Sequence, residues 1–198
     1  MVYMIGEPRA RSANESMPDR LPTFRTPRLT VRPRVMDDLE ACMAMDRDPE
    51  VTRFLPGPWT DPIAHRAFIE QRMRHAYPVG MGYWSIVAPE GFVGWVLLTP
   101  LDLHGPEIEI GWRLVRAAWG RGYATEAARP VLDHALITLR LPEVIADIDP
   151  ANAASVKVAR KLGFRPGSSV PFHGRTVIRH VAGGAGGPDA PVCLEASP

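Results

Sequence analysis

The stretch AAWGRGYATEAA, residues 117 to 128, holds the residues whose types and spacing point most clearly to chemistry. Gly120 and Gly122 permit positive φ angles and allow a ligand to approach the backbone closely. The residues that follow, 125 to 139, are predicted to form a helix. A glycine turn that leads into a helix points backbone N–H groups and the positive end of the helix dipole at an anion. The stretch therefore predicts a turn that binds phosphate.

The sequence leaves open whose phosphate the turn would bind. A Walker loop is excluded, because the string G-x-x-x-x-G-K-[ST] does not occur. A dinucleotide fingerprint stays open, since the glycine turn follows a predicted strand, and Asp147 and Asp149 lie about 25 residues further on, where a ribose-binding acid belongs. Two observations count against it: Thr125 stands at the third glycine position, and little chain remains for a second nucleotide-binding half. Coenzyme A is the third candidate.

The composition narrows the classes of function. The chain has 198 residues and a net charge of +1, which indicates one domain without a strongly basic surface, so neither nucleic acid nor an anionic membrane is expected as a partner. No apolar run approaches the roughly 18 residues that span a bilayer, and the N-terminus lacks an apolar signal segment. Cys42 and Cys193 lie far apart and suggest no disulfide framework. We expect a cytoplasmic protein.

The elements that must position the turn alternate between strands and helices, which predicts a mixed α/β sheet in a single domain over residues 23–182. A loose N-terminal arm is expected over residues 1–22 and a Gly- and Pro-rich tail over 183–198. Pro130 should bend or loosen the helix that follows the turn. The predicted strands cover residues 28–35, 82–89, 91–101, 107–115, 143–149 and 175–182, and the predicted helices cover 39–45, 48–55, 60–75, 125–139 and 150–164.

Other chemistry has little support. The six histidines do not pair with another His, Cys or carboxylate at a metal-ligand spacing, so no metal is expected. The string G-x-S-x-G is absent, and neither cysteine has a local active-site signature. Asn152, after Asp149 and Pro150, is well placed to cap the helix that follows it, with Ser155 in the capping box.

Four segments in order resemble the GNAT acetyltransferase superfamily, in its RimJ/RimL-like branch of ribosomal-protein N-terminal acetyltransferases. They are TPRLTVRPRVMDD, DPEVTRFLPGPW, EIEIGWRL with WGRGYATEA, and NAASVKVARKLGF, and the likeness covers roughly residues 24–165. Trp119 stands where the superfamily loop usually has a polar residue. The resemblance implies a mostly antiparallel mixed sheet, flanked by helices, in which the strands 107–115 and 143–149 splay apart.

The resemblance also implies a co-substrate and the residues that hold it. Acetyl-CoA would place its pyrophosphate on the backbone N–H groups of the glycine turn and its pantetheine arm against the strand 107–115. Asn152 would hydrogen-bond that arm, and Ser155 would lie near the thiol. Arg121 either adds a positive charge or is a solvated surface residue. The residues implied to bind acetyl-CoA are Arg113, Leu114, Val115, Gly120, Arg121, Gly122, Tyr123, Ala124, Thr125 and Asn152.

The implied reaction is direct acetyl transfer to a primary amine, for which Glu109 is the candidate base. Glu107 shares its face of the strand, and either carboxylate could instead be an exposed group or an ion-pair partner of Arg113. At pH 7 a lysine amine costs about 4.6 kcal/mol to deprotonate and an α-amine about 1 to 1.4 kcal/mol, so a single base favours a peptide or protein N-terminus. The alternatives are a small-molecule amine and a catalytically idle CoA-binding or sensor module. A homodimer is possible.

Aromatic residues are expected around the acceptor. The segments FLPGPW and GYWS should line that side of the site. Trp59 and Tyr83 are candidates for it, whereas Trp84 is better explained as an ordinary core residue.

Overall fold

The computed structural model describes residues 21–184. The expected N-terminal arm and C-terminal tail therefore lie outside the described residues, except for 21–22 and 183–184. At the inner end of the predicted arm, the carbonyl of Pro22 accepts a hydrogen bond of 2.7 Å from the Trp84 indole nitrogen. Trp84 itself is fully buried, as predicted for a core residue.

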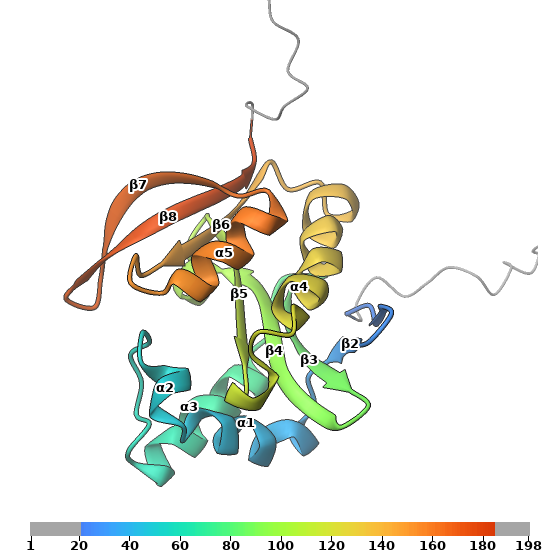
Figure 1. The fold of residues 1–198 in the computed structure, drawn as a ribbon, viewed down its shortest axis with the longest axis vertical. Helices are drawn as coiled ribbons and strands as arrows, with labels where there is room; N and C mark the ends of the chain where they lie inside the picture. Colours follow the sequence, from blue (N-terminus) through green and yellow to red (C-terminus); the bar gives the residue numbers. More distant parts are fainter. Residues whose placement is uncertain (1–20, 185–198) are drawn as a thin grey trace, which may run out of the picture.

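An eight-stranded sheet runs through the molecule in the order β1-β2-β3-β4-β5-β6-β8-β7 (Figure 1). Neighbouring strands are antiparallel, except that β5 and β6 are parallel and are joined at the pair Glu109–Ile145. This confirms the predicted mixed sheet with two splayed strands. The strands are β1 Phe24–Arg25, β2 Thr30–Pro33, β3 Gly82–Ala88, β4 Gly91–Pro100, β5 Ile108–Leu114, β6 Glu143–Ile148, β7 Arg165–Phe172 and β8 Arg175–Gly183.

Five α-helices flank this sheet in the described part of the chain. The start of α3 is specified locally, because the Asp61 side chain accepts hydrogen bonds from the N–H groups of Ile63 and Ala64 and Pro62 occupies the first turn. None of the helices described over residues 21–184 is long and apolar enough to cross a membrane. The helices are α1 Leu39–Asp46, α2 Pro49–Thr52, α3 Pro62–Arg74, α4 Tyr123–Asp133 and α5 Ala153–Leu162.

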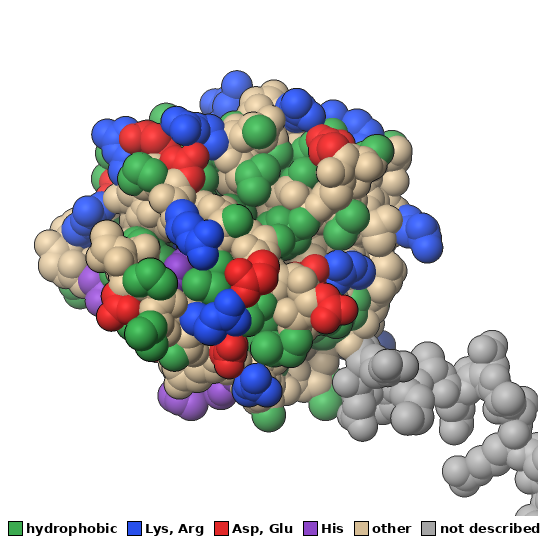
Figure 2. Space-filling view, turned by 90° about the horizontal axis from the view of Figure 1, so that it is seen from below, with side chains coloured by type: hydrophobic (Ala, Val, Ile, Leu, Met, Phe, Trp, Pro, Cys, Tyr) green, Lys and Arg blue, Asp and Glu red, His purple; other side chains and the backbone are tan. Residues whose placement is uncertain are grey.

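The two faces of the sheet are covered by different helices (Figure 1). Trp84 and Val96 belong to a buried cluster that includes residues of α4 and α5. Their strand neighbours Tyr83 and Trp95 belong to a second cluster, with residues of α1 and α3. This alternation follows from the two-residue period of a strand. Figure 2 views the α1–α3 end, where positive and negative side chains are interspersed over the described surface.

The sequence prediction missed two strands and simplified one helix. The edge strand β7 contains Pro166, Gly167 and Pro171, and its pairing with β8 shifts register between Pro166 and Ser169. Such a strand has no apolar alternation to detect, and proline is tolerated at a sheet edge. The two-residue strand β1 was also missed. The predicted helix over 125–139 is instead α4 followed by a π-helical turn over His134–Thr138, and α4 continues through Pro130.

Gly94 on β4 pairs with Leu114 on β5 and allows these two strands to approach closely. Its φ angle is +154°, and a Cβ placed there would lie 2.1 Å from the carbonyl oxygen of Arg113 on β5. A side chain at this position must therefore displace the β5 backbone. Gly91, at the start of the same strand, also has a positive φ of +113°, but a Cβ there would meet nothing within 4 Å.

We predict that Gly94→Ala destabilises the protein more than Gly91→Ala does. Both variants carry backbone strain, but only the first adds an overlap, for which about 1–3 kcal/mol is typical. For a chain of this size the extra loss corresponds to roughly 2–4 °C in Tm for each kcal/mol. Thermal unfolding followed by circular dichroism measures the difference. Equal Tm values for the two variants would show that the β5 backbone can move at Arg113 without a loss of stability.

Candidate active site

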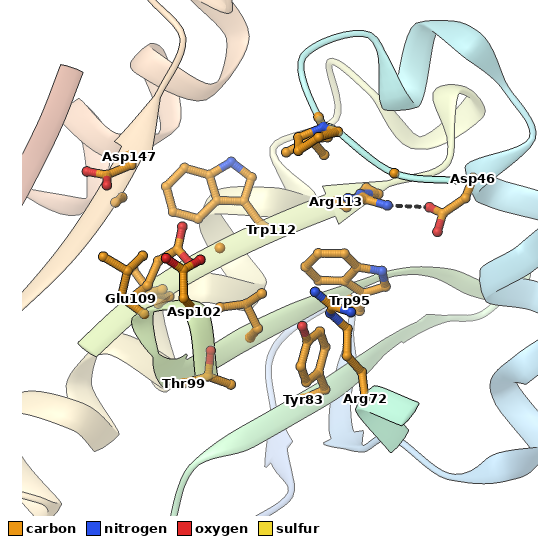
Figure 3. Close-up of a pocket in the computed structure, with 18 of the residues that line it drawn as sticks. Asp46, Arg72, Tyr83, Trp95, Thr99, Asp102, Glu109, Trp112, Arg113 and Asp147 are labelled. Atoms are coloured by element: carbon orange, nitrogen blue, oxygen red, sulfur yellow. Dashed lines mark hydrogen bonds and ion pairs between the residues drawn. The ribbon is translucent and has the colours of Figure 1, made fainter. Parts of the chain in front are cut away.

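A cavity of about 520 Å³ lies where β5 and β6 part. Beyond the pair Glu109–Ile145 the two strands diverge, so their facing edges do not continue the ladder. Figure 3 shows Glu109 and Trp112 on β5 and Asp147 on the neighbouring strand around this space. The cavity is also lined by Asn152 and Ser155 at the start of α5. The divergence thus brings together predicted site residues from β5 and α5.

Glu109 lies at the point where the strands part and is partly buried. Burial raises the pKa of its carboxyl to about 7, with a further increase from the negative charges of Asp147 and Asp102, while Arg179 acts in the opposite direction. A carboxyl group with a pKa near neutrality can accept a proton at physiological pH and hold it. The geometry and the charge therefore make Glu109 suitable as a general base.

The neighbouring carboxylates have partners of their own. Arg179 on β8 donates to both oxygens of Asp147, at 3.0 and 2.9 Å, and lies 3.2 Å from Glu107. The alternative that Glu107 or Glu109 pairs with Arg113 is wrong. Arg113 instead forms a 2.6 Å ion pair with the buried Asp46 of α1. Because other cations hold these acids, Glu109 is left as the carboxylate at the opening of the gap.

Asp46 has a second buried neighbour. The ring nitrogen Nε2 of His65, on α3, lies 3.3 Å from its Oδ2. His65 is only 1% exposed. The pair joins α1 to α3 and, through Arg113, to β5, so His65 is a buried packing residue.

The glycine turn lies outside this cavity, at the N-terminus of α4. Gly120 and Gly122 have φ angles of +75° and +81°, and Gly122 is the N-cap residue of α4. No residue within 21–184 accepts a hydrogen bond from the backbone N–H groups of Gly120 to Thr125; Glu126 is the first to donate, to the Gly122 carbonyl. A run of unpaired N–H groups at a helix start suits a diphosphate. The turn therefore fits the anion that the sequence predicted.

Two side chains of the loop have structural roles that the sequence left open. Arg121 pairs with Glu90 in the β3–β4 turn at 2.9 Å and is half exposed, which favours its reading as a surface residue. Trp119 donates from its indole nitrogen to the carbonyl of Leu114, 2.9 Å away. The tryptophan thereby ties the loop to the end of β5.

At the end of β5, some backbone N–H and C=O groups face β4 and others face the gap between β5 and β6. The Arg113 carbonyl faces Gly94 on β4, and the Val115 N–H donates to the Val93 carbonyl at 3.0 Å. Because backbone groups alternate in direction along a strand, those of Leu114 face the other edge. With its carbonyl bonded to Trp119, Leu114 presents its N–H to the gap. Of the three residues predicted to hold the pantetheine arm, Leu114 has the backbone group best placed for it.

The predicted cap of α5 is confirmed. The Asn152 side-chain oxygen accepts from the Ser155 N–H at 3.1 Å, and Asp149 accepts from the Ala151 N–H. Within the described chain, neither the Asn152 amide nitrogen nor the Ser155 hydroxyl has a protein partner. Both residues line the cavity. Their remaining donors are therefore available to a ligand.

Two aromatic residues that the sequence placed near the acceptor lie in one wall of the cavity, and this wall is also cationic, which the sequence prediction missed. Trp59 and Tyr83 line the cavity, as do the residues Leu55 to Pro58. Arg34, Arg72 and Arg113 lie in the same wall (Figure 3 labels the last two). These arginines come from three separate segments and form no sequence motif, so only the fold brings them together.

Comparison with known proteins agrees with this geometry. The family model described as "Acetyltransferase (GNAT) domain" matches residues 28–165. The N-acetyltransferase p20 of Bacillus licheniformis, itself uncharacterized, is 30% identical over 146 residues, which cover 72% of this chain and 82% of that protein. The crystal structure of an acetyltransferase from Agrobacterium tumefaciens superposes with a TM-score of 0.66 at 29% identity, over 86% of this chain and 99% of that one.

The fold is also shared with the RimJ protein of Mycobacterium smegmatis, solved in complex with CoA-disulfide. The TM-score is 0.65 at 22% identity, over 83% of this chain and 87% of that chain. The family match decides against the dinucleotide-binding alternative for the glycine turn. The splayed strands, the glycine turn at the start of α4 and the family match together show that this chain belongs to the GNAT acetyltransferase family.

Proposed function

We propose that this chain, as an acetyltransferase of the RimJ/RimL kind, transfers the acetyl group of acetyl-CoA to a primary α-amine such as a peptide or protein N-terminus. The observation that carries the proposal is Glu109, a carboxyl group with a pKa of about 7 at the mouth of the gap between β5 and β6. RimJ of M. smegmatis, which has the same fold, was solved with a CoA derivative.

The co-substrate would be held at three places. The unpaired N–H groups from Gly120 to Thr125 would bind its pyrophosphate, and the Leu114 N–H would hydrogen-bond the pantetheine arm in the gap. The Asn152 amide nitrogen would donate to the same arm from α5. This seating would direct the thioester toward Glu109 and Ser155, which line the cavity.

The reaction would proceed without a covalent enzyme intermediate. The neutral amine nitrogen attacks the thioester carbonyl carbon, a C–N bond forms, and the C–S bond breaks. Glu109 accepts the proton that the ammonium group loses to become this neutral amine, and the proton that the nitrogen loses on C–N bond formation is taken up by the departing sulfur. The sulfur leaves as a thiolate, whose pKa near 8.5 makes it a good leaving group, and the Ser155 hydroxyl can donate to it. A backbone N–H beside the carbonyl oxygen would add an oxyanion-type stabilisation of up to about 3 kcal/mol.

The pKa of Glu109 is closer to the pKa of an α-amine than to that of a lysine side chain. An α-ammonium group, with a pKa of about 7.7–8.0, lies within about one unit of Glu109, whereas a lysine ammonium at about 10.4 lies more than three units above it. Transfer of the proton to Glu109 is therefore nearly balanced for the first and costs about 4.6 kcal/mol for the second.

We predict that Gly122→Val abolishes CoA binding at concentrations that saturate the unmodified protein. A β-branched residue disfavours the φ of +81° and covers the N–H groups that would hold the pyrophosphate. Gly184→Val is a matched control, because Gly184 has a φ of +77° and a Cβ there would make only ordinary contacts, at 3.7 Å with Glu143 and 3.9 Å with Arg165, away from the cavity. Calorimetry with CoA measures both affinities. Unchanged affinity in a folded Gly122→Val protein would show that the glycine turn does not bind the pyrophosphate.

We predict that Glu109→Gln lowers kcat about a hundredfold or more, the usual contribution of a general base, while the KM for acetyl-CoA stays nearly the same. In the unmodified enzyme Glu109 is protonated below its pKa of about 7, so turnover should fall as the pH drops through that value. The variant should lose this acidic limb. Glu107→Gln, which removes a neighbouring carboxylate paired with Arg179, serves as the control and should keep it.

We predict that acetylation falls on α-amines. Peptides that carry a free N-terminus and an internal lysine are incubated with the enzyme and acetyl-CoA, and the modified nitrogen is mapped by mass spectrometry. Acetyl groups should accumulate on the N-terminus, because removing the proton of an α-ammonium group costs less free energy than removing that of a lysine ammonium group. Modification mainly of the lysine would overturn the proposed acceptor class, and the absence of any transfer across a panel of peptides and small amines would favour a CoA-binding module.

A further inference from the structure

Two arginines stand in the acceptor wall without an acidic partner. Arg34 follows β2 directly, with its backbone N–H bonded to the Tyr83 carbonyl at 2.9 Å, and Arg72 lies in the last turn of α3. Both line the cavity that contains Glu109 and Tyr83. In Figure 3 Arg72 reaches from the end of α3 toward Tyr83 and Trp95. The wall opposite the base thus carries two positive charges.

The other arginines of this region have their charges matched. Arg113 pairs with Asp46 at 2.6 Å, and Arg32 pairs with Asp38 at 2.7 Å. No carboxylate within residues 21–184 forms an ion pair with Arg34 or Arg72. The Nε and Nη2 atoms of Arg34 are also buried without a hydrogen-bond partner. A buried donor without an acceptor is costly, and this cost would be recovered if a ligand supplied one.

Both guanidinium groups are held by aromatic rings. The central carbon of Arg34 lies 3.8 Å from the centre of the Tyr83 ring, and that of Arg72 lies 3.6 Å from the centre of the Phe68 ring. Stacking of this kind fixes the plane of the guanidinium and leaves its N–H groups, which lie at the edge, free to donate. A planar fork of donors is the group that proteins use to bind a carboxylate in a bidentate manner.

The Tyr83 hydroxyl links these arginines to the base. Burial raises the pKa of this hydroxyl, the charges of Arg34 and Arg72 lower it, and the charge of Glu109 raises it again. Arg34, Arg72 and Glu109 line the same cavity as this tyrosine, and all three act electrostatically on its hydroxyl. An acceptor bound in this cavity is therefore exposed to the carboxyl group of Glu109 and to the positive charges of both arginines.

We propose that Arg34 and Arg72 bind a carboxylate of the acceptor, so that the preferred substrate carries an acidic group close to its α-amine. The inference rests on the proposed function, because Glu109 fixes where the amine must lie. The carboxylate can come from two sources: the α-carboxylate of a free amino acid, or the side chain of an acidic residue at a peptide N-terminus. In either case it forms charge-assisted hydrogen bonds to the two guanidinium groups.

A second hollow gives the acceptor room beyond its acidic group. Arg34, Arg72 and Tyr83 line it together with His75 and Tyr77, and its volume is about 400 Å³. The two arginines thus stand between this hollow and the cavity of Glu109. A carboxylate bound by them leaves the rest of the acceptor a path toward the surface.

The first test compares acceptors that differ in one carboxylate, with kcat/KM calculated per concentration of neutral amine because amidation of methionine lowers the pKa of its α-amine. Methionine is compared with methioninamide, and the C-terminally amidated peptide Glu-Ala-Ala with Gln-Ala-Ala. We expect kcat/KM to favour the acid by about tenfold or more in one of these pairs, and the pair that shows the effect identifies the source of the carboxylate. Equal values within both pairs, or a preference only for phosphoethanolamine over ethanolamine, would overturn the carboxylate subsite and leave the proposed acetyl transfer intact.

The second test removes the arginines. Arg34→Gln and Arg72→Gln should each raise the KM for the acidic acceptor about tenfold or more, with the KM for its neutral counterpart and for acetyl-CoA unchanged. Arg34→Lys should restore part of the preference. Arg74→Gln is the matched control, because Arg74 lies two residues further along α3 with an exposed side chain and pairs with Glu70. A loss of the same size for acidic and neutral acceptors would show that the arginines are only structural.

A binding measurement separates this inference from the proposed function. Calorimetry with the N-acetylated acid and with its amide does not require turnover. Tighter binding of the acid to the unmodified protein, lost in Arg34→Gln, would support the subsite even if acetylation occurred on lysine. Equal binding of the two compounds would reject it even if α-amines were acetylated.

Discussion

The divergence of β5 from β6 is the constraint on which the rest of the site depends. Two parallel neighbours that would otherwise share a ladder meet at the pair Glu109–Ile145 and then part. Their facing backbone groups need other partners, and the cavity between them provides the space for a ligand to supply these. The same divergence places Glu109 at the opening, where burial and the nearby Asp102 and Asp147 raise its pKa to about 7. The divergence of the two strands therefore accounts for both the position of Glu109 and its raised pKa.

Some charged groups around the cavity form ion pairs within the protein, and others are left to interact with a ligand. Arg179 holds Asp147 and lies beside Glu107, and Asp46 holds Arg113. These pairs fix β8 against β6 and α1 against β5, so they serve the walls of the cavity. The groups left over are a carboxyl that can take a proton and cations that can hold an anion. The acceptor that suits this arrangement brings an amine to the first and an acid to the second.

Local signals predicted most of the fold and the local conformation of two segments that are proposed to hold the co-substrate. Gly122 needed a positive φ and Asn152 needed to cap a helix, and both requirements can be read from a few adjacent residues. The strand β7 gave no such signal, because its prolines and glycine remove the alternation that identifies a strand. The cationic wall could not be predicted either, since Arg34 and Arg72 are brought together only by the packing of α3 against the sheet. Nor does the pKa of Glu109 follow from its sequence neighbours, because Asp147 and Arg179 reach it from other strands.

The most direct test of this mode of CoA binding is a crystal structure of the protein with CoA. We predict that the pyrophosphate is bound by the N–H groups of Gly120 to Thr125 and that the pantetheine arm lies between β5 and β6 beside Leu114 and Asn152. The sulfur should end near Glu109 and Ser155. A pyrophosphate bound elsewhere, or an arm that leaves the gap between β5 and β6 unfilled, would contradict it.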